Sequence, residues 1–146
     1  MTTDPAPLAG TALTDRVAVV LAVPLQAAFG ARLIDPADPA AGVEFEVGDL
    51  AGNGAGGAHA GALAVGLEVA ALLAALPALS TAEHAVTVST ASTLIAPATH
   101  GGTVAFRGTL DRRTGRSVFA GAVATSAGVT VARAQIVKAV VRYTGA

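Results

Sequence analysis

The stretch NGAGGAHAGALAVGLEVAALLAAL, Asn53–Leu76, decides how this chain folds. Its first part is rich in glycine, and its second part is a run of Ala, Val, Leu and Gly with one charged residue, Glu68. Pro77 follows, and proline cannot continue a helix interior. This composition and length predict a helix over Ala60–Leu76 that begins directly after a glycine-rich loop. Because the helix has no polar stripe, it must be surrounded on every side.

A membrane span is the first alternative for this run. The apolar segment Ala60–Ala82 is long enough, since a span requires about 20 residues. However, Glu68 near its middle would be costly in lipid. No Lys or Arg occurs between Arg32 and Arg107, so the positive flank that orients a span is missing. We therefore interpret the run as the core helix of a soluble domain and expect no membrane partner.

The overall composition excludes several other classes of protein. The chain has 146 residues, enough for one domain, and 53% of them are hydrophobic. Charged residues make up 13% and the net charge is −1, which argues against a nucleic acid partner. The absence of cysteine excludes disulfides, thiolate catalysis and Cys-bound zinc, and it fits a cytoplasmic location.

The N-terminal sequence MTTDPAPLAG has no basic residues and is not expected to be a signal peptide. We predict a flexible tail over residues 1–13 and a single domain over residues 14–146. A short helix is expected over Asp15–Val23, capped by Thr14 or Asp15 and ended by Pro24. A short extended segment, Phe29–Asp35, should follow.

Strand patterns occur on both sides of the core helix. Val43–Val47 alternates apolar and acidic residues, which is typical of a half-buried strand. Four Val- and Thr-rich segments follow the helix, with turn signals at 113–116 and 126–128, so the sheet should be antiparallel. These segments are AVTVSTASTL, TVAFRGTLDR, SVFAGAVAT and VTVARAQIVKAVV. The predicted fold class is α+β, with a curved antiparallel sheet wrapped around one long central helix.

Glu68 is the residue that most suggests chemistry. A carboxylate among Ala64, Val65 and Leu72 on one helix face is disfavoured unless it meets donors or water. A partly desolvated carboxylate suits a general base or nucleophile near neutral pH. A structural role for a single buried glutamate is the alternative.

The start of the same helix offers a second group of candidates. His59, Ala60 and Gly61 place unpaired backbone N–H groups at the positive end of the helix dipole, where they can polarise a carbonyl or bind an oxyanion. Asn53 adds a side chain that both donates and accepts hydrogen bonds. A histidine at this position can also be a simple helix cap.

The combination of these residues resembles the hotdog-fold acyl-CoA thioesterases of the PaaI-like type. The matching pattern is Asn53, then His59 after five residues, then an acid nine residues later, then a Val-Thr-Val strand that ends before Pro97. The resemblance covers about Phe29–Val141. It implies a hotdog fold, in which a long helix lies inside an antiparallel sheet.

The resemblance also implies a role for each residue at the helix start. Asn53 would help to hold the attacking water or the substrate. His59 would position the thioester, and the backbone N–H of Ala60 or Gly61 would polarise its carbonyl. The family usually has glycine directly after the histidine, so the methyl group of Ala60 could crowd the thioester.

The remaining implications concern Glu68, Thr87 and the assembly. Glu68 would be the general base or the nucleophile, and Thr87 would contact the reacting groups. The acid is often aspartate in this family. The site would lie between two chains, so a homodimer is expected, with two dimers often paired into a tetramer. Coenzyme A would be part of the substrate, and no separate cofactor or metal is expected.

Three basic residues, Arg112, Arg113 and Arg116, cluster at a predicted hairpin and could contact the phosphates of CoA, because arginine pairs well with phosphate.

We expect a thioesterase that hydrolyses a small or medium acyl- or aryl-CoA. A non-catalytic hotdog protein that binds acyl-CoA or forms a structural dimer is the alternative, favoured by Ala60. A hotdog dehydratase ranks last, because no Asp precedes a His by four or five residues.

Overall fold

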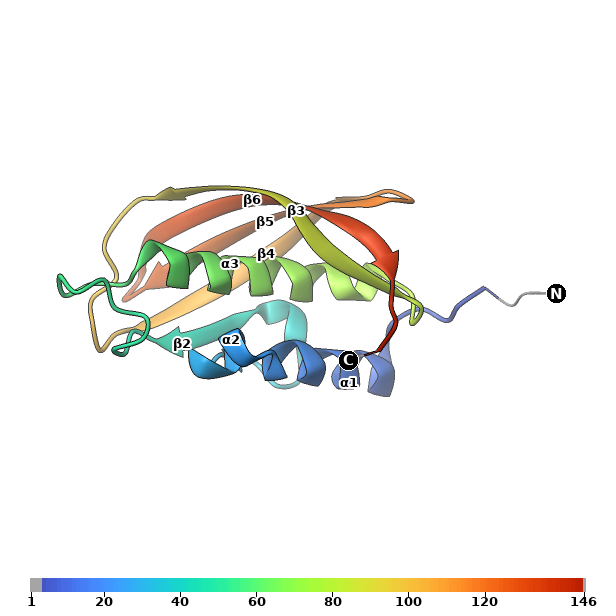
Figure 1. Cartoon of the computed structure of the whole chain (residues 1–146), viewed down its shortest axis with the longest axis horizontal. Coiled ribbons are helices and arrows are strands. Elements are labelled where there is room, and N and C mark those ends of the chain that lie inside the picture. Colours follow the sequence, from blue (N-terminus) through green and yellow to red (C-terminus); the bar gives the residue numbers. More distant parts are fainter. Residues whose placement is uncertain (1–3, 146) are drawn as a thin grey trace.

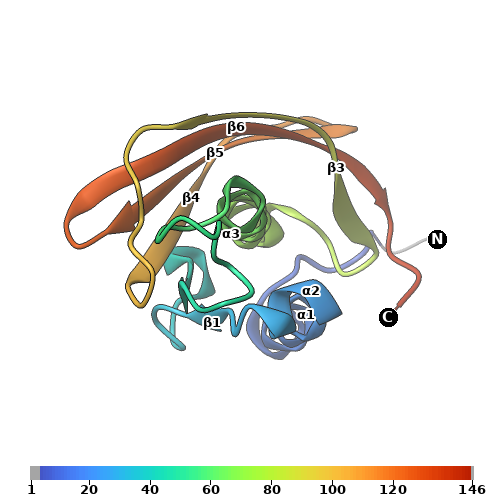
Figure 2. The ribbon, with the colours of Figure 1, turned by 60° about the vertical axis from the view of Figure 1, so that its left-hand side comes forward.

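A computed structural model describes residues 4–145 of the chain, and its centre is a single long helix. Helix α3 (Ala60–Ala75) begins and ends close to the predicted bounds, and a 3-10 turn, η2 (Leu76–Ala78), continues it through the proline. The helix lies in the concave side of the sheet (Figure 2). Residues from all sides of α3 are buried, as expected for a helix without a polar stripe: Ala62, Leu63, Gly66, Leu67, Val69, Ala70, Ala71, Leu72, Leu73 and Ala75.

The sheet has six antiparallel strands in the order β1-β2-β4-β5-β6-β3. It curves over one side of α3 (Figures 1 and 2). The turns predicted at 113–116 and 126–128 join β4 to β5 and β5 to β6. The strands are β1 (Arg32–Leu33), β2 (Val43–Glu46), β3 (Glu83–Leu94), β4 (Thr103–Arg113), β5 (Ser117–Ser126) and β6 (Val129–Arg142).

Two glycines allow α3 to approach the sheet closely. A methyl group at Gly66 would overlap the ring of Phe106 on β4, and one at Gly108 would overlap the carbonyl of Ala70 on the helix. Phe106 also packs against Phe45 of β2, with ring centroids 4.9 Å apart. The absence of two Cβ atoms therefore sets how deeply the helix lies against the sheet.

The N-terminal segment differs from two predictions, the extent of the tail and the cap of the first helix. Helix α1 starts at Gly10 and runs to Ala22, so helical structure begins inside the segment predicted to be a tail, and no side chain caps its first turn. Leu8 is buried, and its N–H donates to the Leu79 carbonyl at 2.9 Å. Residues 1–3 lie outside the described part of the chain. The apolar face of α1, with Val17 and Val20 buried, explains why this segment is held in place.

The segment after α1 is also more helical than predicted. Helix α2 (Pro24–Ala28) starts at the proline that ends α1, because proline is well suited to a first helical turn. The extended run predicted over Phe29–Asp35 shrinks to the two residues of β1. Helices α1 and α2 lie on the side of α3 opposite the sheet (Figure 2).

The helical segment Ala60–Ala78 has a mean hydropathy of 1.9 and is long and apolar enough to cross a membrane. In the fold it is enclosed by the sheet on one side and by α1 and α2 on the other (Figure 2), and 56% of it is buried. Its apolar character is therefore accounted for by packing inside the domain.

Candidate active site

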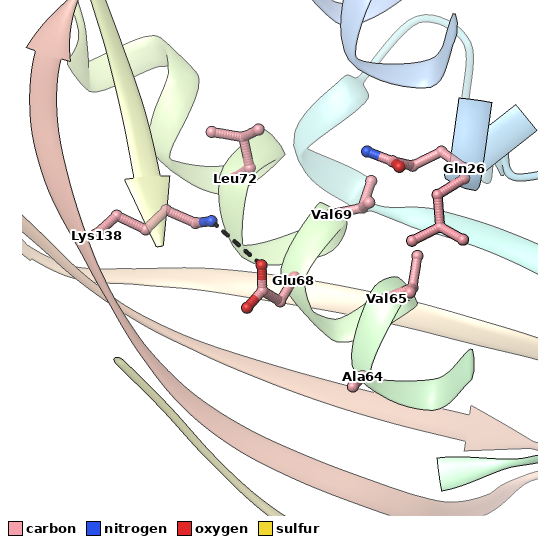
Figure 3. A pocket seen from close by; sticks show the side chains of 8 residues that line it. Gln26, Ala64, Val65, Glu68, Val69, Leu72 and Lys138 are labelled. Atoms are coloured by element: carbon pink, nitrogen blue, oxygen red, sulfur yellow. Dashed lines mark ion pairs between the residues drawn. The ribbon is translucent and has the colours of Figure 1, made fainter. Parts of the chain in front are cut away.

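Glu68 faces a cavity of about 310 Å³ between α2, α3 and β6 (Figure 3). The sequence suggested a carboxylate buried among apolar residues. In the structure the Glu68 side chain is 34% exposed, so it is only partly buried. The neighbours on its own helix are the expected apolar ones, but two polar residues from elsewhere also reach the cavity. The lining residues are Leu25, Gln26, Ala64, Val65, Glu68, Val69, Leu72 and Lys138.

A chain of two hydrogen bonds connects Glu68 to the sheet. The Thr87 hydroxyl donates to Glu68 Oε2 at 2.8 Å, and Lys138 Nζ donates to Thr87 Oγ1 at 2.7 Å. Lys138 Nζ lies 4.0 Å from Glu68 Oε2 (Figure 3). Thr87 and Lys138 are direct partners on β3 and β6, so the strand register holds the two side chains together. Thr87 therefore lies beside the acid, and its predicted contact with the reacting groups stays a prediction.

Sequence reasoning missed Lys138. The residue is 3% exposed, and burial lowers the pKa of its ammonium group below the ordinary value, while the nearby Glu68 carboxylate opposes this shift. A signal was present in the composition. The chain has nine Lys and Arg residues, and Lys138 is the only lysine among them. The occurrence of the only lysine of the chain within a predicted strand is the signal that could have identified it.

The helix start is arranged differently from the prediction. His59 caps α3, with its Nδ1 atom accepting a hydrogen bond from the Gly61 N–H at 2.9 Å. In the neutral ring the proton then lies on Nε2. Because His59 occupies the Gly61 N–H, that group is not free to polarise a carbonyl. The Ala60 N–H forms no hydrogen bond within residues 4–145, so it is the available donor.

Asn53 shapes the glycine-rich loop before α3. Its side-chain Oδ1 accepts from the N–H groups of Ala55 at 2.7 Å and Gly57 at 3.1 Å. No acceptor in the described chain engages the Nδ2 group, which stays available as a donor. Asn53 also lines a second cavity, of about 290 Å³, together with Leu94 and Ile95 at the end of β3.

The acid and the free donor are far apart within one chain. Ala60 and Glu68 are separated by eight residues, which corresponds to about 12 Å along a helix axis. Reacting groups must lie about 3 Å from the atoms on which they act. The rise along the helix is several times larger than these distances, even though the Glu68 side chain leans toward the helix start.

The predicted arginine cluster lies on the β4–β5 turn, at the opposite end of α3 from the glycine-rich loop (Figure 1). Arg113 is engaged there, because it donates to Glu83 Oε1 and to the Thr114 carbonyl, both at 2.7 Å. Arg112 and Arg116 are exposed. A contact between these arginines and CoA phosphates stays a prediction. Among the described residues, no group of three or more His, Asp or Glu side chains could hold a metal ion.

Solved structures with this arrangement of helix and sheet are numerous. The PaaI protein of Escherichia coli, from the phenylacetic acid degradation operon, has 19% identity and a TM-score of 0.72 over 91% of this chain and 94% of its own. The chain has the hotdog fold. A mutant of PaaI from Thermus thermophilus has 24% identity and a TM-score of 0.70, covering 80% and 97%. A Bacillus halodurans protein determined with CoA has 18% identity and a TM-score of 0.74, covering 88% and 83%. No protein-family model matches the sequence, and no curated protein is significantly similar to it.

The hotdog domain thus divides the predicted site residues into two groups. Glu68 and Thr87 meet in one cavity with Lys138. Glu68 is in the middle of α3, whereas the second group lies at the start of α3 and in the loop before it. The second group is Asn53, His59, Ala60 and Gly61.

Proposed function

We propose that this protein is an acyl-CoA thioesterase that hydrolyses a small or medium acyl- or aryl-CoA to the free acid and CoA. The observation that carries the proposal is the Glu68 carboxylate on a cavity wall, with Oε2 bound to Thr87 and Oε1 unengaged within the described chain. The similarity to PaaI proteins, and to a hotdog protein determined with CoA, supports the same chemistry.

The proposed reaction uses the unengaged oxygen of Glu68. Oε1 either removes a proton from a water molecule that attacks the thioester carbonyl carbon, or attacks that carbon itself and is released by water in a second step. A carbon–oxygen bond forms and the carbon–sulfur bond breaks. The CoA thiolate leaves and takes up the proton. The Ala60 N–H, at the positive end of α3, stabilises the negative charge on the carbonyl oxygen.

We propose that the Ala60 N–H comes from a second copy of the chain, since 12 Å is too far within one helix. Strand β3 offers the surface for this second copy. Among residues 4–145 it pairs only with β6, so its other edge is open, and it contains no charged residue from Ala85 to Leu94. Val88 is 62% exposed and Leu94 is 52% exposed. A long, uncharged edge strand with exposed apolar side chains is a site for pairing with another strand.

Antiparallel pairing of two β3 strands would bring the two half-sites together. Glu68 is bound to Thr87, near the start of β3, and Asn53 lines a cavity with Leu94, at its end. These two strand positions are about 23 Å apart in one chain, at about 3.3 Å per residue. In an antiparallel pair the start of one strand lies beside the end of the other. The Glu68 cavity of one chain would then face the Asn53–Ala60 region of its partner, which supports a homodimer.

The test is the release of CoA from a panel of acyl- and aryl-CoA thioesters. Because the chain contains no cysteine, a thiol reagent reports free CoA without a contribution from the protein. Glu68→Gln should lower kcat/KM by about a hundredfold or more, the usual scale for the loss of a general base. Glu46→Gln, the same chemical change at an exposed site on β2, is the matched control and should keep full activity.

A second candidate function, the non-catalytic binding of acyl-CoA, is favoured by Ala60, whose methyl group stands at the helix start where relatives usually have glycine. Binding of CoA by calorimetry without hydrolysis of any thioester in the panel would select this alternative. Equal turnover by wild type and Glu68→Gln would make the carboxylate structural.

A further inference from the structure

Lys138 is a buried ammonium group with two polar neighbours, Thr87 and Glu68. It is the only lysine in the chain, it lies on β6, and it is 3% exposed. Its Nζ atom donates to Thr87 at 2.7 Å and lies 4.0 Å from Glu68 Oε2. A buried charge is unfavourable unless it is paired and hydrogen-bonded. A structural strand position facing the core would more simply hold an apolar residue, so the charge itself requires an explanation.

The two hydrogen bonds have a defined direction. A protonated lysine can only donate, and an ionised glutamate can only accept. The Thr87 hydroxyl has a single hydrogen, so it accepts from Lys138 and must donate to Glu68. Without Lys138 the hydroxyl could rotate and donate to another acceptor. The lysine therefore determines which way the Thr87 hydrogen points.

We propose that Lys138 is a positioning residue of the hydrolytic site, which acts through Thr87 to hold Glu68 Oε2 and leave Oε1 facing the cavity. This inference rests on the proposed thioesterase function. Linked hydrogen bonds polarise one another, so the positive end of this chain strengthens the bond to Glu68. The two carboxylate oxygens are no longer equivalent, and a single one is presented to the substrate.

The arrangement predicts a dependence on alkaline pH. Burial lowers the pKa of Lys138, so the group loses its proton at a lower pH than an exposed lysine, whose pKa is about 10.4. A neutral amine can accept from Thr87, which would reverse the hydroxyl and take the donor away from Glu68. The other groups that act on this region are Glu68 on α3, which raises the pKa of Lys138, and His84 on β3. The pKa of His84 is lowered mainly by burial and further by Arg16 and Lys138, so His84 is neutral in the alkaline range.

The kinetic test compares five variants with the wild type. Lys138→Met has a similar length and no charge, and it should lower kcat/KM by about tenfold or more, the scale of a misplaced catalytic group. It should also abolish the alkaline fall in activity. Lys138→Arg should recover part of the activity and move the alkaline fall to higher pH, because a guanidinium group does not lose its proton. Thr87→Val combined with Lys138→Met should be no worse than Thr87→Val alone, since both act through one chain. Arg133→Met, which removes an exposed cation from the same strand, is the control.

A second measurement does not depend on turnover. Labelling the protein with [13Cε]lysine gives one signal, because Lys138 is the only lysine. Its titration should move to lower pH in Glu68→Gln, since Glu68 raises the pKa of Lys138. If the wild type hydrolyses no thioester, the proposed function fails, and the titration still tests the coupling. The proposal is overturned if Glu68→Gln leaves the lysine titration unchanged, or if an active Lys138→Met enzyme retains both the wild-type kcat/KM and the alkaline fall.

Discussion

Two inactive variants of this chain should restore activity when they are combined in one dimer. The first is Glu68→Gln, which removes the base. The second is Ala60→Pro, which removes the free N–H at the start of α3. Ala60 occupies the first helical position, where proline is well tolerated, and His59 already has the extended backbone that precedes proline, with φ −68° and ψ 138°. The substitution therefore deletes the donor and breaks no hydrogen bond within the described residues.

The magnitude follows from the geometry of the proposed site. Each variant alone should lose activity by about a hundredfold or more, as expected for a base or an oxyanion donor. If each site combines Glu68 of one chain with Ala60 of the other, a mixed dimer has one intact site and one doubly altered site. Random reassembly of equal amounts makes about half of the dimers mixed, so about one quarter of the wild-type activity should return.

The assay is CoA release after the two variants have been co-expressed, or unfolded together and refolded. Ala60→Gly keeps the N–H and is the control for the change at position 60; it should retain wild-type activity. Recovery near one quarter supports a site shared between chains. A mixture that shows only the mean activity of its two components would mean that the acid and the donor act within one chain, or that one of them has no role.

Three further outcomes are expected. Gly66→Ala should lower the free energy of unfolding by about 1–3 kcal/mol in urea titrations, because the added methyl overlaps the Phe106 ring; an unchanged value would contradict the close approach of α3 to the sheet. Val88→Lys places a charge on the open edge of β3 and should give monomers in sedimentation experiments, with activity lost together with the dimer; a stable dimer would point to another interface. Lys138 has a folded-state pKa below its unfolded value, so its contribution to stability is fully present above about pH 10.4 and is lost as pH falls through the folded pKa. Unfolding measured across this range should therefore show the wild type gaining stability relative to Lys138→Met as pH rises, and a constant difference would refute the shift.

The sequence by itself determined the architecture and identified the carboxylate of the candidate site. The uniformly apolar run after the glycine-rich loop predicted α3, and the alternating and Val-rich segments predicted the strands, because burial on every face and a period of two are local patterns. The same run identified Glu68, since a lone carboxylate among apolar residues is conspicuous in any window of sequence. The predicted start of α1 was wrong, because the N-terminal segment is held by a contact between Leu8 and Leu79, which is far along the chain.

Only the tertiary structure decided what surrounds the carboxylate. Lys138 and Thr87 are 51 residues apart, and they meet because β3 and β6 pair in one particular register, which shifts by a bulge between Thr87 and Ser89. A slip of one residue would turn either side chain to the other face of the sheet. The use of the Gly61 N–H by His59, which leaves Ala60 as the free donor, likewise depends on a side-chain orientation. Periodicity in a sequence reports which face of an element is buried, whereas the partners across that face depend on register and packing between distant segments.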